Sequence, residues 1–137
     1  MKPVFADTFY WIALLNPRDA FHQRVLDHPP RTIVTTDEVL SEFLTYCASN
    51  PVLRTAAALI VVDILADSDV QVIPQSRASF LSGVDLYRSR PDKGYSLADC
   101  ISMMTMGQAG LDEVFTNDRH FEQEGFRPLF RDPHQVP

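Results

Sequence analysis

The chain has 137 residues, of which 45% are hydrophobic and 22% are charged, so it can bury a substantial core and is unlike a disordered segment. We predict that residues 1–137 form a single domain. The formal net charge of −6 argues against a broad basic surface that holds nucleic acid. It leaves open an enzyme that binds RNA locally while metal ions offset the charge of its own site.

The cysteines and the apolar runs indicate the compartment of the protein. Cys47 and Cys100 lie in apolar helical patterns and form no C-x-x-C pair, which favours buried, reduced thiols over a disulfide or a zinc site. The apolar run from Phe9 to Leu15 lacks the basic segment of a signal peptide and is too short to span a membrane. These features predict a cytoplasmic protein that does not associate with a membrane.

Strands and helices alternate along the first half of the chain. Thr35 and Glu38 have the spacing of a capping box at a helix start, and Asn50 before Pro51 is typical of another start. The run from Ile60 to Val62 could be a strand, but the length of the apolar segment around it favours a helix. In chain order, the patterns predict a strand at 4–6, helices over 8–15 and 19–27, a strand at 32–35, and helices from 35 to about 49 and from 51 onward.

The second half continues this alternation. The patterns predict a strand at 70–73, a helix over 76–90 capped by Ser76, a helix opened by the capping box Ser96-x-x-Asp99, a strand at 113–116, a short helical turn from Asp118 and a fifth strand at 128–131. Short apolar strands that alternate with helices predict an α/β fold with three layers, α/β/α, around a mostly parallel sheet of four to five strands. In such folds ligands bind beyond the carboxyl ends of the strands, where the strand order reverses.

Four acidic residues, Asp7, Glu42, Asp99 and Asp118, lie at or near a helix start or a strand end. Each has a simpler structural explanation, because three of them could cap helices or turns and Glu42 could be a solvated residue beside an apolar stripe. The helix that Asp99 opens is apolar nearly all round, so this acid is expected to be poorly solvated. If the four carboxylates meet in space, they would form a site for hard divalent cations and for metal-assisted cleavage of a phosphodiester.

The order of these acids and the residues around them resemble the PIN-domain endoribonucleases, and in particular the VapC-like toxins of type II toxin–antitoxin systems. The resemblance covers nearly the whole chain. Its most specific part is Ser96-Leu97-Ala98-Asp99, followed about twenty residues later by Thr116-Asn117-Asp118-Arg119-His120-Phe121. The other matching phrases are Asp7-Thr8, Asp19-x-x-His22, Ser41-Glu42-Phe43-Leu44 and Gly125.

The resemblance implies a function and a set of site residues. Asp7, Glu42, Asp99 and Asp118 would hold Mg²⁺ or Mn²⁺, and RNA would be the substrate. A cognate antitoxin would block the acidic site, and the protein would pair as a homodimer, which fits the apolar surface of the helix that begins at residue 51. Some relatives carry further acids where this chain has Asn117, so the resemblance leaves open whether one or two metal ions bind. The residues expected to act as polar groups around the metal or to contact the substrate are Thr8, Thr116, Asn117 and Arg119.

Two other functions compete with a metal-dependent endoribonuclease. One is a different metal-dependent phosphohydrolase; a phosphoaspartyl phosphatase would need a second aspartate at position 9, where this chain has Phe9. The other is a catalytically silent PIN-like module that binds RNA or a protein, which the intact set of four acids argues against. His120 is a lone histidine without a spaced partner, so the sequence does not support a zinc site.

Overall fold

A computed structural model describes residues 1–131. Its centre is a sheet of five strands in the order β3-β2-β1-β4-β5, and every neighbouring pair is parallel. This arrangement confirms the predicted parallel sheet and reaches the upper of the two predicted strand numbers. The strands are β1 (Val4–Ala6), β2 (Ile33–Thr36), β3 (Val70–Ile73), β4 (Glu113–Phe115) and β5 (Arg127–Pro128).

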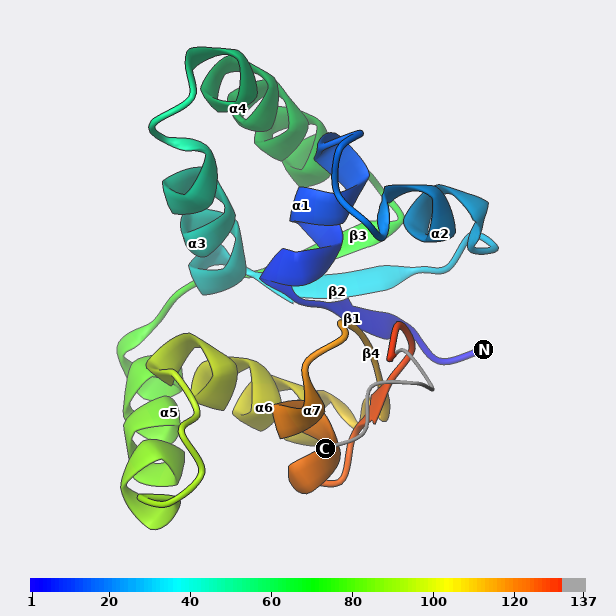
Figure 1. The fold of residues 1–137 in the computed structure, drawn as a ribbon. Helices are drawn as coiled ribbons and strands as arrows, with labels where there is room; N and C mark the ends of the chain where they lie inside the picture. The colour runs from blue at the N-terminus through cyan, green and yellow to red at the C-terminus, as the bar shows by residue number, and fades with distance from the viewer. Residues whose placement is uncertain (132–137) are drawn as a thin grey trace.

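Helices cover both faces of this sheet, as predicted for a three-layer α/β/α fold. Figure 1 shows α1 to α4 on one face and α5 to α7 on the other. The run at residues 60–62 is helical, in agreement with the prediction from its length. The helices are α1 (Thr8–Leu15), α2 (His22–Asp27), α3 (Asp37–Cys47), α4 (Pro51–Ala66), α5 (Arg77–Ser89), α6 (Leu97–Ala109) and α7 (Arg119–Gln123).

The middle strand of the sheet is wholly buried. Val4, Phe5 and Ala6 have no exposed surface, because β1 has a strand on either side and helices on both faces. A strand in this position must be apolar along its whole length rather than at alternate residues. Cys47 and Cys100 are also buried and unpaired, which confirms the prediction of buried thiols.

Two predicted helix starts differ from the structure. The N-cap of α3 is Thr36, whose side chain accepts a hydrogen bond from the amide of Val39, and not Thr35. Thr35 is still part of β2, and its hydroxyl donates to the carbonyl of Ala6 instead. The second helix begins at His22 rather than at residue 19, because Asp19 uses its side chain in a turn with the amide of Phe21.

The last strand is shorter than predicted and begins one residue earlier. The fifth strand is Arg127–Pro128 and does not extend over the predicted 128–131. Over residues 129–131, only two backbone hydrogen bonds, from Leu129 to Val114 and from Phe130 to Thr116, join the chain to β4 and to the residue that follows β4. No helix within residues 1–131 is long and apolar enough to cross a membrane.

The strand order places a crevice at one end of β1. The chain passes from β1 to β2 and β3 on one side, and it returns to the other side of β1 as β4. The connections therefore diverge between β1 and β4, and ligands bind at such a point beyond the carboxyl ends of the strands. Asp7 follows β1 directly, and Thr116 follows β4 directly.

Candidate metal centre

Asp7 stands at the N-cap position of α1, yet its carboxylate does not cap the helix. The backbone at Asp7 is extended, and its side chain makes no capping hydrogen bond. Instead, the hydroxyl of Thr116 donates to Asp7 Oδ2 over 3.0 Å. The simpler structural explanation, a capping aspartate, therefore does not describe what this side chain does.

Burial gives the Asp7 carboxyl unusual acid–base properties. The residue is only 8% exposed, and this desolvation is the main reason that its pKa rises to about 7. The nearby charge of Asp99 raises the pKa further, and that of Glu42 adds a smaller effect, whereas the hydrogen bond from Thr116 lowers it. Asp7 therefore gains from any positive charge that binds between these carboxylates.

Glu42 approaches Asp7 from α3, on the same face of the sheet as α1 (Figure 1). The hydroxyl of the buried Thr8 donates to Glu42 Oε1 over 2.6 Å. Glu42 is itself exposed, as a flank residue of its helix would be, but this bond turns its carboxylate toward the carboxyl end of β1. Thr8 is thus a residue that orients an acid.

Asp99 completes the capping box of α6, whose N-cap is Ser96, and keeps one carboxylate oxygen free. Its Oδ2 accepts from the amide of Ser96 over 3.1 Å, and the Ser96 hydroxyl accepts from the amide of Asp99, so the predicted capping box is confirmed. No hydrogen bond occupies Asp99 Oδ1 within the described residues. Burial raises the pKa of Asp99, and the charges of Asp118 and Glu42 add to this effect. The capping function and a ligand function are therefore compatible in this side chain.

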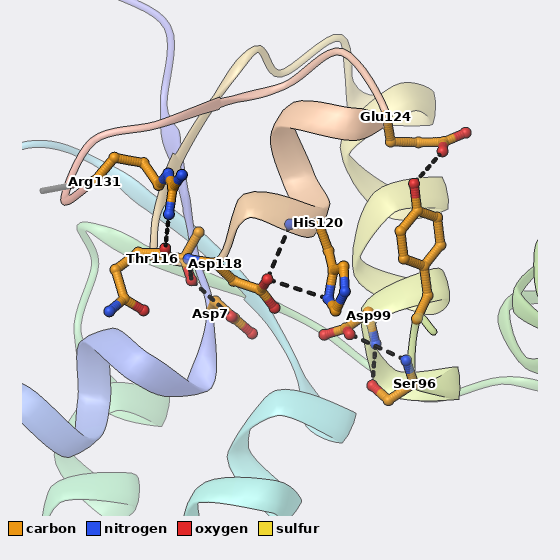
Figure 2. Close-up of polar contacts among 10 residues, drawn as sticks. Asp7, Ser96, Asp99, Thr116, Asp118, His120, Glu124 and Arg131 are labelled. Atoms are coloured by element: carbon orange, nitrogen blue, oxygen red, sulfur yellow. Dashed lines mark hydrogen bonds and ion pairs between the residues drawn. The ribbon is translucent and has the colours of Figure 1, made fainter. Parts of the chain in front are cut away.

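Asp118 is itself the N-cap residue of α7. Its Oδ1 accepts from the amide of His120 over 2.9 Å, and its own amide donates to the hydroxyl of Thr116 over 3.2 Å. The His120 imidazole lies beside it, with Nδ1 3.1 Å from Asp118 Oδ1 (Figure 2). The Thr116 hydroxyl therefore bonds to two of the four acidic residues: it donates to the Asp7 carboxylate and accepts from the backbone amide of Asp118.

Three of these side chains form a compact group. Each of Asp99, Asp118 and His120 offers one ligand atom, and the three atoms lie within 4.8 Å of one another. Asp7 and Glu42 do not belong to this group, although the charge of Glu42 raises the pKa of Asp99 and the charge of Asp99 raises the pKa of Asp7. Of the four predicted acids, Asp99 and Asp118 therefore lie within 4.8 Å of each other, whereas Glu42 and Asp7 each accept a hydrogen bond from a threonine hydroxyl.

The remaining predicted residues differ in their accessibility. Arg119 is exposed, and Asn117 is half-buried with its backbone carbonyl bonded to Arg131 over 3.3 Å. Thr8 and Thr116 are buried and bonded to acids, so their hydroxyls face the carboxylates rather than solvent.

The sequence patterns missed a network beside the acidic group. Tyr95 donates its hydroxyl proton to Glu124 Oε2 over 2.8 Å, and Arg90 donates to both oxygens of Glu124 over 2.8 and 3.3 Å. The Tyr95 ring meets the His120 ring edge-on, with centroids 5.4 Å apart. No motif links these residues, which are separated by up to 34 positions, so only the fold could reveal them.

A cleft lies between α3, α5 and α6, and none of the four acids lines it. Its volume is about 630 Å³, and Leu97 and Ile101 of α6 are among its lining residues. Glu38, one helical turn before Glu42, also lines it. Arg77 supplies a positive charge in this cleft.

Comparisons with known proteins agree with this architecture. A family model described as the PIN domain matches residues 4–126, so the chain belongs to the PIN domain family. The chain is 25% identical over 130 residues to the 23S rRNA-specific endonuclease VapC20 of Mycobacterium tuberculosis, a match that covers 90% of this chain and 95% of VapC20.

Two crystal structures are similar to the fold. That of VapC20 from M. tuberculosis, described as a toxin that cleaves the sarcin-ricin loop, has a TM-score of 0.79 over 90% of this chain and 95% of VapC20. That of FitAcB from Neisseria gonorrhoeae has a TM-score of 0.61, 16% identity and coverage of 97% and 99%, and it shows the shared fold alone. These findings confirm the predicted fold and the predicted similarity to PIN-domain endoribonucleases of the VapC kind.

Proposed function

We propose that this protein is a metal-dependent endoribonuclease in which Asp7, Glu42, Asp99 and Asp118 hold Mg²⁺ or Mn²⁺. The observation that carries the proposal is the close group at the carboxyl ends of β1 and β4, where ligand atoms of Asp99, Asp118 and His120 lie within 4.8 Å of one another. Membership of the PIN domain family and similarity to an rRNA endonuclease support the same reaction.

The donor set fits a divalent cation. Carboxylate oxygens are the ligands that Mg²⁺ and Mn²⁺ prefer. The pKa values of Asp7 and Asp99 are raised, which indicates that the protein alone compensates the negative charges of these carboxylates poorly. His120 Nδ1 is a buried nitrogen without a hydrogen-bond partner among the described residues, which is a second sign of a missing contact in this group.

The residues of the chain have distinct tasks in this proposal. Thr116 and Thr8 orient Asp7 and Glu42 through their hydroxyls, so both threonines act through the acids. The exposed Arg119 at the start of α7 is placed to contact a phosphate of the RNA. A bound divalent cation would activate water and stabilise the charge that develops on the phosphoryl and leaving oxygens.

Matched aspartate variants test the reaction. Asp118→Asn and Asp99→Asn each remove a charged ligand at nearly constant volume, so Mn²⁺- or Mg²⁺-dependent cleavage of RNA should fall by about 100-fold or more. Asp63→Asn, in the exposed part of α4, is the control and should cleave at the parent rate. If both site variants remain folded and cleave RNA as fast as the parent, Asp99 and Asp118 are not catalytic. A parent protein that does not cleave RNA with either ion would instead be a silent PIN-like module or act on another phosphoester.

We further propose a structured ribosomal RNA as the substrate and a toxin as the biological role. VapC20, whose whole length is similar to this chain, is a 23S rRNA-specific endonuclease. Purified 23S rRNA and an unstructured RNA of equal length should therefore be offered to the protein with Mn²⁺. Faster cleavage of the unstructured RNA would argue against this substrate class without affecting the assignment as a nuclease.

A small antitoxin with a basic segment is the proposed partner. The net charge of −6 and the acidic group favour an inhibitor that places an arginine or lysine in the metal centre. Expression of this protein alone should slow the growth of a bacterial host, and co-expression of the antitoxin should restore it. Unimpaired growth with folded, metal-binding protein would contradict the toxin role.

We also propose that the protein is a homodimer. The outer side of α4 exposes Val52, Leu59, Val62 and Leu65, each by more than 60%. Apolar side chains gathered in this way on a monomer mark an interaction surface. Light scattering at tens of micromolar should show a dimer, and the pair of substitutions Leu59→Glu and Val62→Glu should reduce dimerisation if α4 forms the interface. A parent protein that is monomeric at this concentration would contradict the proposal.

A further inference from the structure

We propose that His120 is an additional ligand residue of the metal centre and that its imidazole makes the site bind Mn²⁺ more tightly than Mg²⁺. This inference rests on the proposed metal-dependent function, because it concerns the same centre. It assigns a task to a histidine that the four-acid pattern leaves out.

The position of the imidazole is the first argument. A ring nitrogen of His120 and one oxygen each of Asp99 and Asp118 lie within 4.8 Å of one another. His120 Nδ1 and Asp118 Oδ1 are 3.1 Å apart. Neighbouring ligands of an octahedral ion with bonds of about 2.1 Å are separated by about 3.0 Å, so these two atoms have the spacing of adjacent ligands.

The direction of the nitrogen is the second argument. His120 Nδ1 is buried, and despite its short distance to Asp118 it is not aligned with any acceptor for a hydrogen bond among residues 1–131. Asp118 Oδ1 already accepts a hydrogen bond from the amide of His120. His120 Nδ1 and Asp118 Oδ1 are close without forming a hydrogen bond, so both atoms can be ligands of a cation that lies between them and Asp99.

The support behind the imidazole is the third argument. Tyr95 packs edge-on against the ring, and Tyr95 is fixed by Glu124, which Arg90 holds with two hydrogen bonds. Figure 2 shows the His120 ring next to the carboxylates of Asp118 and Asp99. The ring is therefore held in one orientation, as ligand side chains are.

The chemistry of nitrogen leads to the metal preference. Mg²⁺ prefers oxygen ligands, whereas imidazole binds well to transition metals. A site with three or four carboxylates and one imidazole should accept both ions through its oxygens. Only Mn²⁺ should gain appreciably from the nitrogen.

Spectroscopy of bound Mn²⁺ tests the inference directly. Electron spin-echo modulation of the folded protein with Mn²⁺ should show coupling to one ¹⁴N nucleus, and labelling of histidine with ¹⁵N should replace that signal. His120→Gln should abolish the coupling and weaken Mn²⁺ binding by about 10- to 100-fold, but weaken Mg²⁺ binding by less than about threefold. His22→Gln, which changes an imidazole bonded to the Ala13 carbonyl, is the matched control and should change neither quantity.

The outcomes separate this inference from the proposed function. Mn²⁺ that binds without nitrogen coupling, together with unchanged Mn²⁺ affinity in His120→Gln, would overturn the ligand role of His120 and leave the carboxylate centre standing. Mn²⁺ that does not bind to the parent protein, or that binds equally well to Asp99→Asn and Asp118→Asn, would overturn both. The labelled parent protein gives the decisive signal even if His120→Gln does not fold.

Discussion

Thr116 donates a hydrogen bond to Asp7 over 3.0 Å and so joins two residues that are 109 positions apart in the chain. The same hydroxyl oxygen accepts from the amide of Asp118 over 3.2 Å. One buried side chain at the end of β4 thus sets the position of the acid that follows β1 and of the turn that carries a second acid. Threonine suits this position because its hydroxyl is both a donor and an acceptor.

Replacement of Thr116 should weaken the metal centre without removing a ligand. Thr116→Val has nearly the same shape but loses both hydrogen bonds, so the pKa of Asp7 should rise further and metal should compete less well with the proton. RNA cleavage near pH 7 should fall by about 10- to 100-fold and should recover in part as the pH rises. Thr116→Ser keeps the hydroxyl and is the control. A flat ratio of the two variants' rates between pH 6 and 9 would contradict this account.

The raised pKa of Asp7 predicts how stability depends on pH in metal-free protein. The pKa is about 7 in the folded chain against 3.8 for an ordinary, solvated aspartate, so the folded state binds the proton more tightly than the unfolded state. The Asp7 contribution to stability is therefore fully present below about pH 4 and is lost as the pH rises through 7. Metal-free Asp7→Asn should lack this loss and should be more stable than the parent at pH 7.5, by at most about 4 kcal/mol.

Melting temperatures in the presence of a chelator measure this difference. The advantage of Asp7→Asn should shrink steadily between pH 7 and pH 4, where the parent carboxyl is protonated in both states. Saturating Mn²⁺ should reverse the order at pH 7.5, because the parent binds the ion more tightly. Asp63→Asn serves again as the control for a change in net charge. An Asp7→Asn variant that is less stable than the parent at pH 7.5 without metal would argue against a strained carboxylate.

Ser96 and Asp99 allow capping to be separated from ligand chemistry. Ser96→Ala removes the hydroxyl that accepts from the amide of Asp99, so α6 should lose about 1 kcal/mol while RNA cleavage stays within a fewfold of the parent. Asp99→Asn keeps a capping oxygen and should lose cleavage with little loss of stability. Thermal melts and cleavage rates of both variants decide the matter. The reverse pattern would make Asp99 a structural residue.

Gly83 should be needed for the contact between α5 and α6. A Cβ at this position would overlap Ile101 Cγ1, which lies in the branch of a buried side chain rather than at a flexible end. Gly83→Ala should therefore destabilise the protein by about 1–3 kcal/mol although alanine favours helices. Gly107→Ala, where no atom lies within 4 Å of the new Cβ, is the matched control and should be neutral or stabilising. Denaturant unfolding of both variants gives the comparison, and equal stability would contradict the close contact.

The sequence by itself determined the layers of the fold and the order of the acids. The alternation of short apolar runs with capped helices requires a parallel sheet covered on both faces, because buried strands must be apolar and parallel crossovers need helices. Errors were confined to short segments such as the start of α3, where Thr35 and Thr36 are equivalent as capping residues until the register of β2 is known.

Only the tertiary structure decided how the acids act together. Local patterns gave Asp7 and Asp99 similar explanations as capping residues, whereas the structure shows that Asp99 belongs to the capping box of α6 and that Asp7 bonds to Thr116 instead. The place of His120 beside two acids, and its support by Tyr95, depend on contacts between α6, α7 and the loop before α6. Such contacts have no local signature, because the packing of distant segments creates them and no periodicity in the chain encodes their distance.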